Sequence, residues 1–178
     1  MNNVKIPLEY QLGAEGEGFY ITMEGFDAAR LLVSTTCVGA AERALEIGID
    51  YLKQREAFGN KLVNYQGIQF QLADKYAQLQ ALKQMIYKTA WLVNKKYEKA
   101  EPGKQCDRAA ALDCSKWLSM CKLLAPKLAF DIFYDTMLWF GAYGYTKECP
   151  LELGLRGIMS YCIGAEGSQN VQRIVLAR

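Results

Sequence analysis

The stretch Val38-Gly-Ala-Ala-Glu-Arg-Ala-Leu-Glu-Ile-Gly-Ile-Asp-Tyr-Leu52 decides the fold class of this chain. Its apolar residues recur every three or four positions, which is the period of one face of an α-helix. The residues of this stripe are Val38, Ala41, Leu45, Ile49 and Leu52. The helical period begins near Thr22, and the predicted first helix ends near Arg55.

Two further segments carry the same helical period. The second predicted helix covers about residues 64–100, and the third covers about residues 105–140. The apolar face of the second helix consists of Ile68, Leu72, Tyr76, Leu79, Leu82 and Ile86. The apolar face of the third consists of Trp117, Cys121, Leu124, Leu128 and Ile132. Pro126 removes one backbone donor from the third helix, so we expect a kink there.

Turn and cap residues separate these helices and end the chain. Glu101-Pro-Gly-Lys104 has proline and glycine in the order that a type II turn requires, which predicts a chain reversal. Gly141-Ala-Tyr-Gly-Tyr145 is a break, and Pro150 suits the first turn of a short helix. Ser168 is a candidate N-cap for a final helix. The apolar residues of that helix are Val171, Ile174 and Val175. Three long antiparallel helices and shorter ones after them predict an all-α, up-and-down bundle.

The first residues of the chain have a different character. Residues 4–12 predict an extended β-strand, and the glycine-rich residues 13–18 predict a turn. A single strand cannot form a sheet alone. We therefore expect residues 1–20 to be the remnant strand and turn of a preceding β-domain, and residues 21–178 to be a separate helical-bundle domain.

Composition excludes several classes of protein. A chain of 178 residues that is 51% hydrophobic can bury the core of one domain. Its 21 Lys and Arg residues and 19 Asp and Glu residues are scattered along the chain, so we expect no nucleic-acid partner. No segment approaches the roughly 20 consecutive apolar residues that span a bilayer, and no signal peptide is evident. The sequence predicts a soluble, cytoplasmic protein with no membrane partner.

The chain has no histidine and six cysteines. The lack of histidine excludes Ser-His and Cys-His nucleophiles and leaves carboxylates, Lys, Tyr and Cys for proton transfer. The cysteines form no CxxC pair, which argues against a metal site and against a disulfide framework. We therefore expect no metal and reduced thiols.

A series of short motifs lies at the ends of the predicted helices. The motifs are Gly25-Phe-Asp-Ala-Ala-Arg30, Gln54-Arg-Glu-Ala-Phe-Gly59, Tyr65-Gln66, Leu72-Ala-Asp74, Gly144-Tyr-Thr-Lys147, Glu166-Gly-Ser168, Val171-Gln-Arg173 and Ala177-Arg178. Together, and in this order, they resemble the acyl-CoA dehydrogenase family. The resemblance implies an FAD-dependent enzyme that removes the α-proton and the β-hydride of an acyl-CoA thioester. It also implies that an N-terminal helical domain and most of a β-domain are missing from this chain.

The resemblance makes Glu166 the catalytic base, directly before Gly167. Some family members place the base immediately before the arginine that matches Arg30, but Ala29 occupies that position here. The residue before the glutamate is Ala165 instead of an aromatic residue, and the preceding loop is one residue longer than in the family. The alternative interpretation is that Glu166 only favours a helix N-terminus electrostatically.

By resemblance, Asp27, Arg30 and Gly167 bind the acyl-CoA substrate. A rigid guanidinium fork can hold a phosphate or a carbonyl oxygen. Alternatively, Asp27 is an N-cap and Arg30 is solvated on the helix surface.

The resemblance assigns further residues to FAD. Arg55, Phe58 and Gln66 match a loop that reaches the FAD of a neighbouring subunit, although Phe58-Gly59 also fits an ordinary helix-ending turn. A second predicted FAD-contacting group consists of Leu138, Gly141 and Ala142, where leucine and alanine replace the glutamine and second glycine of the family. Ser168 and Asn170 are predicted to meet flavin or ribose oxygens at a helix start, although capping alone also explains Ser168.

Partners also follow from the resemblance. They are an acyl-CoA substrate, an electron-transfer flavoprotein, and further copies of the chain in a dimer or tetramer. Two alternatives stay open, an acyl-CoA oxidase and a catalytically silent helical module for assembly or binding. Because most of the flavin cradle is missing, we expect the isolated chain to bind FAD weakly and to be inactive.

Overall fold

The computed structural model describes residues 2–98 and 108–177. Its helices are α1 (Gly18–Gln54), α2 (Gln66–Glu98), α3 (Arg108–Trp139), α4 (Pro150–Ile163) and α5 (Gln169–Leu176). Its shorter elements are the 3-10 turns η1 (Leu8–Tyr10), η2 (Leu62–Asn64) and η3 (Gly141–Tyr145) and the strands β1 (Glu56–Ala57) and β2 (Asn60–Lys61). This confirms the predicted all-α fold. No helix among the described residues is long and apolar enough to cross a membrane.

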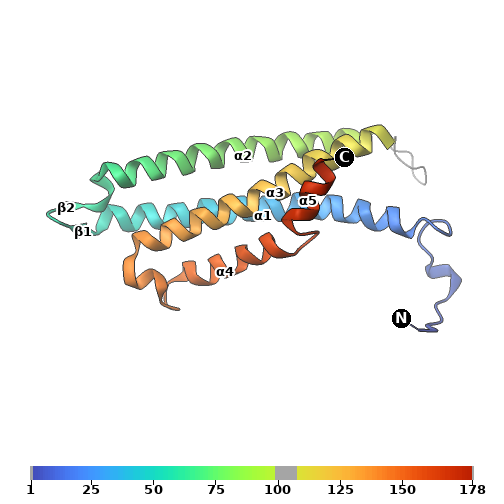
Figure 1. Ribbon diagram of the computed structural model, residues 1–178, viewed down its shortest axis with the longest axis horizontal. Coiled ribbons are helices and arrows are strands. Elements are labelled where there is room, and N and C mark those ends of the chain that lie inside the picture. The colour runs from blue at the N-terminus through green and yellow to red at the C-terminus, as the bar shows by residue number, and fades with distance from the viewer. Residues whose placement is uncertain (1, 99–107, 178) are drawn as a thin grey trace.

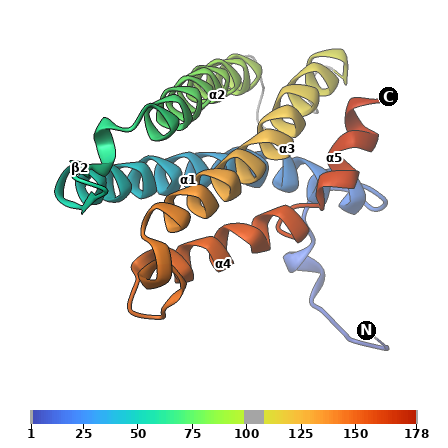
Figure 2. The ribbon, with the colours of Figure 1, turned by 60° about the vertical axis from the view of Figure 1, so that its left-hand side comes forward.

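The three long helices run up, down and up, and α4 returns beside α3 (Figure 1). Helices α1 and α3 are parallel to each other, and residues that meet across them are separated by the same number of positions at both ends of their contact. Asp27 meets Ser115, which lies 88 residues later, and Gly48 meets Thr136, which lies 88 residues after it (136 − 48). The short α5 crosses back against α3 (Figure 2).

Small side chains allow α1 and α3 to pack closely. The buried small residues of this seam are Cys37, Ala41, Ala44 and Gly48 on α1, and Cys121, Ala125 and Ala129 on α3. A Cβ added at Gly48 would lie only 2.6 Å from Cγ2 of Thr136 and 3.1 Å from the Trp139 ring. The two backbones therefore approach more closely than larger side chains would permit.

The buried faces differ in part from the predicted ones. Leu79, Leu82 and Ile86 of α2 are buried as predicted, but Tyr76 is 61% exposed. In α3, Leu124 is 50% exposed, while the alanines of the seam are fully buried. The hydrophobic period gives a leucine more weight than an alanine, whereas close helix packing favours the smaller side chain.

Residues 4–12, predicted as an extended strand, form no strand within this chain, and their pairing with a preceding β-domain stays a prediction. The chain is extended at Pro7 and Gln11 but forms the 3-10 turn η1 between them, and its apolar side chains are exposed. Among the described residues no strand lies beside this segment, so its backbone groups cannot enter a ladder. The turn before α1 is confirmed, with positive φ at Gly13 (73°) and Gly16 (88°). The division into two domains near residue 20 stays a prediction.

Other predicted features hold with changes of a few residues. Helix α1 begins at Gly18, four residues before Thr22, and α3 continues through the buried Pro126 without a break. Pro150 occupies the first turn of α4 as predicted. Ser168 is the N-cap residue of α5, although its side chain makes no capping hydrogen bond. The turn predicted over residues 101–104 lies outside the described residues.

We predict that Gly48→Ala destabilises the bundle by about 1–3 kcal/mol, because the added methyl group overpacks the seam between α1 and α3. Gly39→Ala is the matched control, since Gly39 lies exposed on the same helix and its added Cβ meets no atom within 4 Å. The control change should stabilise the helix by up to about 1 kcal/mol. Urea unfolding of both variants measures the difference. Equal stabilisation by the two changes would contradict the close packing of α1 on α3.

Candidate functional site

The loop between α4 and α5 carries Glu166 in an uncommon backbone conformation. Ala165 has φ 45°, Glu166 has φ 51° and Gly167 has φ 99°. The left-handed region costs a non-glycine residue about 1–2 kcal/mol. Two such residues in succession persist only where surrounding contacts hold them, and such contacts are concentrated at functional sites.

Lys122 of α3 holds the start of this loop. Its Nζ atom donates to the carbonyl oxygens of Tyr161 (2.6 Å) and Gly164 (3.0 Å). Both carbonyls belong to the C-terminal end of α4, where a helix leaves its last carbonyls unpaired and carries a partial negative charge. The Lys122 side chain is fully buried.

Two side chains from other helices hold the middle of the loop. Arg30 of α1 donates through Nε to the carbonyl oxygen of Glu166 (3.3 Å). Gln172 of α5, which is fully buried, donates through Nε2 to the carbonyls of Glu166 and Gly167 (both 3.2 Å). A Cβ at Gly167 would lie 3.0 Å from Gln172 Nε2 and 3.0 Å from Val171 Cγ1. This position therefore requires glycine for space as well as for its positive φ.

Asp27 neutralises the buried Arg30. The Arg30 Nη1 atom lies 2.6 Å from Oδ1 of Asp27, and Oδ2 of Asp27 accepts a hydrogen bond from the Ser115 hydroxyl of α3. The side chains of Arg30 and Asp27 are only 7% and 16% exposed. Both alternative interpretations of this motif are therefore wrong. Asp27 lies within α1 and is not an N-cap, and Arg30 is buried because its charge has a partner.

The Glu166 carboxylate has no such partner. Its Oε2 atom is buried and makes no hydrogen bond to any described residue. The N–H groups of Glu166 and Gly167 likewise donate to no residue in the described part of the chain. The bonds to this loop hold its main-chain carbonyls, while no described residue bonds the Oε2 atom or these two N–H groups.

Two thiols near Lys122 are held in the protonated form. Burial raises the pKa of the Cys37 thiol to about 12, and the nearby Cys162 adds to the shift. Burial also raises the pKa of Cys162 and lowers the pKa of the Lys122 ammonium. At neutral pH both thiols therefore stay protonated and are not nucleophiles.

A second group of predicted residues lies at the far end of the bundle. Arg55, Phe58 and Gln66 surround the hairpin formed by β1 and β2, and all three are exposed. The hairpin turn consists of Phe58 and Gly59, with φ 54° and 79°. A two-residue hairpin turn with positive φ at both positions is compact, so this segment is not an ordinary helix-ending turn. The Phe58 ring is 99% exposed.

The C-terminal end of α3 and the following η3 lie at the same end of the bundle as the hairpin (Figure 1), and these two elements contain Leu138, Gly141 and Ala142. Tyr51, near the end of α1, stacks on Phe140 with ring centroids 4.1 Å apart. Arg30 and Arg55 are 25 residues apart on or next to α1, which corresponds to about 37 Å along a helix axis. The structure therefore brings the predicted residues together as two separate groups. Ser168 and Asn170, which begin α5, belong to the Glu166 group.

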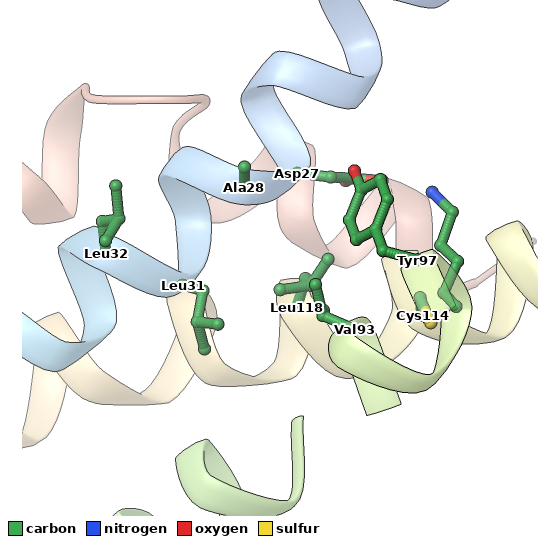
Figure 3. A pocket seen from close by; sticks show the side chains of 9 residues that line it. Asp27, Ala28, Leu31, Leu32, Val93, Tyr97, Cys114 and Leu118 are labelled. Carbon is green, nitrogen blue, oxygen red and sulfur yellow. The ribbon is translucent and has the colours of Figure 1, made fainter. Parts of the chain in front are cut away.

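A mainly apolar cavity of about 230 Å³ lies between α1, α2 and α3. Its lining residues include Asp27, Leu31, Val93, Tyr97 and Leu118, and Figure 3 shows the Tyr97 ring next to Asp27. Asp27 lines the cavity, and its partner Arg30 contacts the Glu166 loop. The ion pair of Asp27 and Arg30 therefore lies between the cavity and the loop. The sequence patterns gave no indication of this cavity.

Sequence reasoning also missed Lys122 and Gln172. A signal for Lys122 was present, because it lies four residues after Leu118 and three before Ala125, on the buried face of its helix. A lysine is almost never fully buried without a partner, so a lysine at such a position indicates a specific role. Gln172 gave a weaker signal, since a glutamine next to the start of a helix is common.

Comparison with known proteins gives consistent matches over the chain. Residues 16–178 match the family model described as acyl-CoA dehydrogenase, C-terminal domain. The chain is 33% identical over 177 residues to an acyl-CoA dehydrogenase of Bacillus subtilis (strain 168), covering 99% of this chain and 42% of that protein.

Solved structures match equally well. Butyryl-CoA dehydrogenase from Megasphaera elsdenii matches with a TM-score of 0.84 at 33% identity, over 98% of this chain and 41% of that one. A chain in the structure of the electron transferring flavoprotein of Acidaminococcus fermentans matches with a TM-score of 0.84 at 35% identity, over 97% of this chain and 41% of that one. This chain therefore spans about two-fifths of the length of the relatives that it matches.

We predict that Asp27→Asn destabilises the chain by about 3 kcal/mol, because it leaves the buried Arg30 charge without a counter-charge. The matched control is Glu46→Gln, which breaks the exposed pair of Arg43 and Glu46 at the same spacing on α1. An exposed pair contributes at most about 1 kcal/mol. Chemical denaturation of both variants tests the contrast, and a similar small effect for both would show that Arg30 is solvated.

Proposed function

The chain belongs to the acyl-CoA dehydrogenase family, whose C-terminal helical domain it matches, and we propose that it is part of an FAD-dependent enzyme that desaturates an acyl-CoA thioester. The observation that carries this proposal is the state of Glu166. Its loop is held in a strained conformation by buried donors, while its Oε2 atom is buried without a hydrogen bond. A side chain in that state is available to accept a proton from a bound molecule.

Proton removal from the α-carbon of a thioester requires a base close to that carbon. Glu166 suits this role because the Arg30 guanidinium forms its ion pair with Asp27 instead. Arg30 contacts Glu166 through a hydrogen bond to the main-chain carbonyl and forms none with the carboxylate. Among the described residues the carboxylate forms no salt bridge, and the Lys122 ammonium interacts with it only at longer range. With Ala29 at the alternative position of the base, no second carboxylate competes there.

The same loop can stabilise the negative charge that develops on the thioester oxygen. The N–H groups of Glu166 and Gly167 donate to none of the described residues and lie next to the carboxylate in the chain. Fixed N–H donors directed at a developing oxyanion lower the barrier to its formation. We infer that these N–H groups bind the thioester carbonyl, which is the role proposed for Gly167. Asp27 and Arg30 then support the site by holding the loop, in addition to the substrate contact proposed for them.

FAD, when bound, accepts the hydride that leaves the β-carbon. The exposed residues at the far end fit this cofactor in part. Arg55 has no ion-pair partner among the described residues, so its charge is available to a pyrophosphate, and the fully exposed Phe58 and Gln66 can be covered by a ligand. Gly141, with φ 60°, permits close backbone approach. Leu138 is 59% exposed but offers no hydrogen bond, and Ala142 offers only its backbone.

The separation of the two groups supports a homo-oligomer. One small-molecule cofactor cannot contact Glu166 and Arg55 of the same chain across about 37 Å of helix. We propose that the far-end residues Arg55, Phe58, Gln66, Leu138, Gly141 and Ala142 contact the FAD of a second copy, in a dimer or tetramer, while Ser168 and Asn170 contact the FAD beside Glu166. We also propose an electron-transfer flavoprotein as the electron acceptor, in view of the match to the Acidaminococcus fermentans structure.

We predict that Glu166→Gln slows flavin reduction by acyl-CoA about 10²–10⁴-fold in the full-length, FAD-loaded protein, because the general base is lost. Anaerobic titration with a panel of acyl-CoA esters, followed by flavin absorbance, measures the effect. Glu148→Gln is the control, because Glu148 is an exposed residue between η3 and α4, away from the loop.

Each outcome of this titration has a distinct meaning. Equal rates for wild type and Glu166→Gln would place the base at another residue. A wild-type protein whose flavin no ester reduces would support the catalytically silent module instead.

A further inference from the structure

Three side chains from three different helices converge on the loop between α4 and α5. Lys122 binds the carbonyls of Tyr161 and Gly164, Arg30 binds the carbonyl of Glu166, and Gln172 binds those of Glu166 and Gly167. We propose that Lys122, together with Arg30 and Gln172, is a positioning residue that fixes the direction of the Glu166 carboxylate by holding the main chain on both sides of it. The proposal rests on the proposed role of Glu166 as the base.

The placement of these bonds explains how they can act on a side chain that they do not touch. Lys122 fixes the Gly164 carbonyl before the two left-handed residues, and Arg30 and Gln172 fix the Glu166 carbonyl after Ala165. With both ends held, the backbone between them cannot relax to a more favourable region without breaking a buried hydrogen bond. The Cα–Cβ direction of Glu166 is therefore set by its main chain.

Burying Lys122 at the end of α4 is energetically unfavourable, because the unpaired carbonyls there require only a hydrogen-bond donor and not a charge. Its ammonium is fully buried, and within the described residues it forms no ion pair with a carboxylate. Burial lowers the pKa of the ammonium, an effect that the nearby Glu166 carboxylate offsets only in part. Taking a charge out of water is unfavourable, and a neutral capping residue could satisfy one of the same carbonyls. The ammonium, however, holds two carbonyls three residues apart at once, because it offers three donors at the end of a long stem.

The arrangement also keeps the carboxylate available. Each of the five hydrogen bonds ends on a carbonyl oxygen, and none ends on a carboxylate oxygen of Glu166. A positive group that bound the carboxylate directly would compete with the substrate proton. Holding the carbonyls instead makes the loop rigid without occupying the base.

The test uses Lys122→Met in the full-length, FAD-loaded protein, since methionine fills a similar volume without charge or donors. We expect kcat to fall about 10–100-fold, because a displacement of about 1 Å can cost 10²-fold in rate. Substrate affinity, measured as Kd for a non-reducible acyl-CoA analogue, should change by less than about 3-fold. The kinetic isotope effect with α-deuterated substrate should rise, since proton removal becomes more rate-limiting.

A second readout does not depend on catalysis. Hydrogen exchange, followed by mass spectrometry on the peptide that contains residues 164–168, should become at least about 10-fold faster in Lys122→Met, because the loop opens more often. Unchanged exchange in this peptide together with unchanged kcat would overturn the proposal.

Lys75→Met is the matched control. Lys75 is also mostly buried, with 12% of its side chain exposed, and it donates to a main-chain carbonyl, that of Asp131 (3.3 Å). It belongs to α2, pairs with Asp135 and lies on the face of α2 that meets α3. Its loss should lower overall stability but leave loop exchange, kcat and the isotope effect as in wild type. The same loop and rate changes in Lys75→Met would show a general packing effect and overturn the assignment.

A further variant covers the case in which Lys122→Met does not fold. Gln172→Met removes the hydrogen bonds to the Glu166 and Gly167 carbonyls at the other side of the loop. As for Lys122→Met, kcat should fall while Kd for the acyl-CoA analogue stays nearly unchanged. Wild-type values in this variant would overturn the proposal. If wild-type flavin is reduced by no acyl-CoA, the proposed function fails, while the exchange comparison still decides whether Lys122 holds the loop.

Discussion

Small side chains line α1 and α3 where the two helices meet, and at Gly48 the side chains of Thr136 and Trp139 leave no room for a Cβ atom. This close, parallel contact sets the register of the whole bundle, since Asp27 and Ser115 meet with the same sequence offset as Gly48 and Thr136. Because the register is fixed, Arg30 and Lys122 face the same loop from two helices. A wider seam would separate these two side chains from the loop that they hold.

The polar groups inside the bundle are satisfied mainly by the main chain. Arg30 and Lys122 bring two positive charges into the interior, yet only Arg30 has a carboxylate partner, Asp27. The remaining donors meet carbonyls at the end of α4 and in the loop after it. The stability that such bonds supply offsets the strain at Ala165 and Glu166. Strain that is stabilised in this way is characteristic of sites where a side chain must be held for chemistry.

The two ends of the domain differ in structure. The partly buried Glu166 loop is held by several hydrogen bonds, whereas the hairpin end presents a fully exposed Phe58 and an Arg55 that has no ion-pair partner among the described residues. A long, rigid helix joins the two ends, so each keeps its geometry independently of the other. Under the proposed function, one copy of the chain supplies the base for one FAD and the far-end contacts for another.

The sequence by itself determined the helical class and the approximate bounds of the long helices, and through the resemblance it predicted Glu166 as the base. These features depend on local periodicity and on short motifs, which can be recognised within a few turns of chain. Residues 4–12 have the pattern of a strand but form none within this chain, since whether a strand forms depends on its partners. Only the tertiary structure decided that Arg30 is buried and that Lys122 and Gln172 hold the loop. Arg30 and Glu166 are 136 residues apart in the chain, and no local pattern encodes a hydrogen bond over that separation.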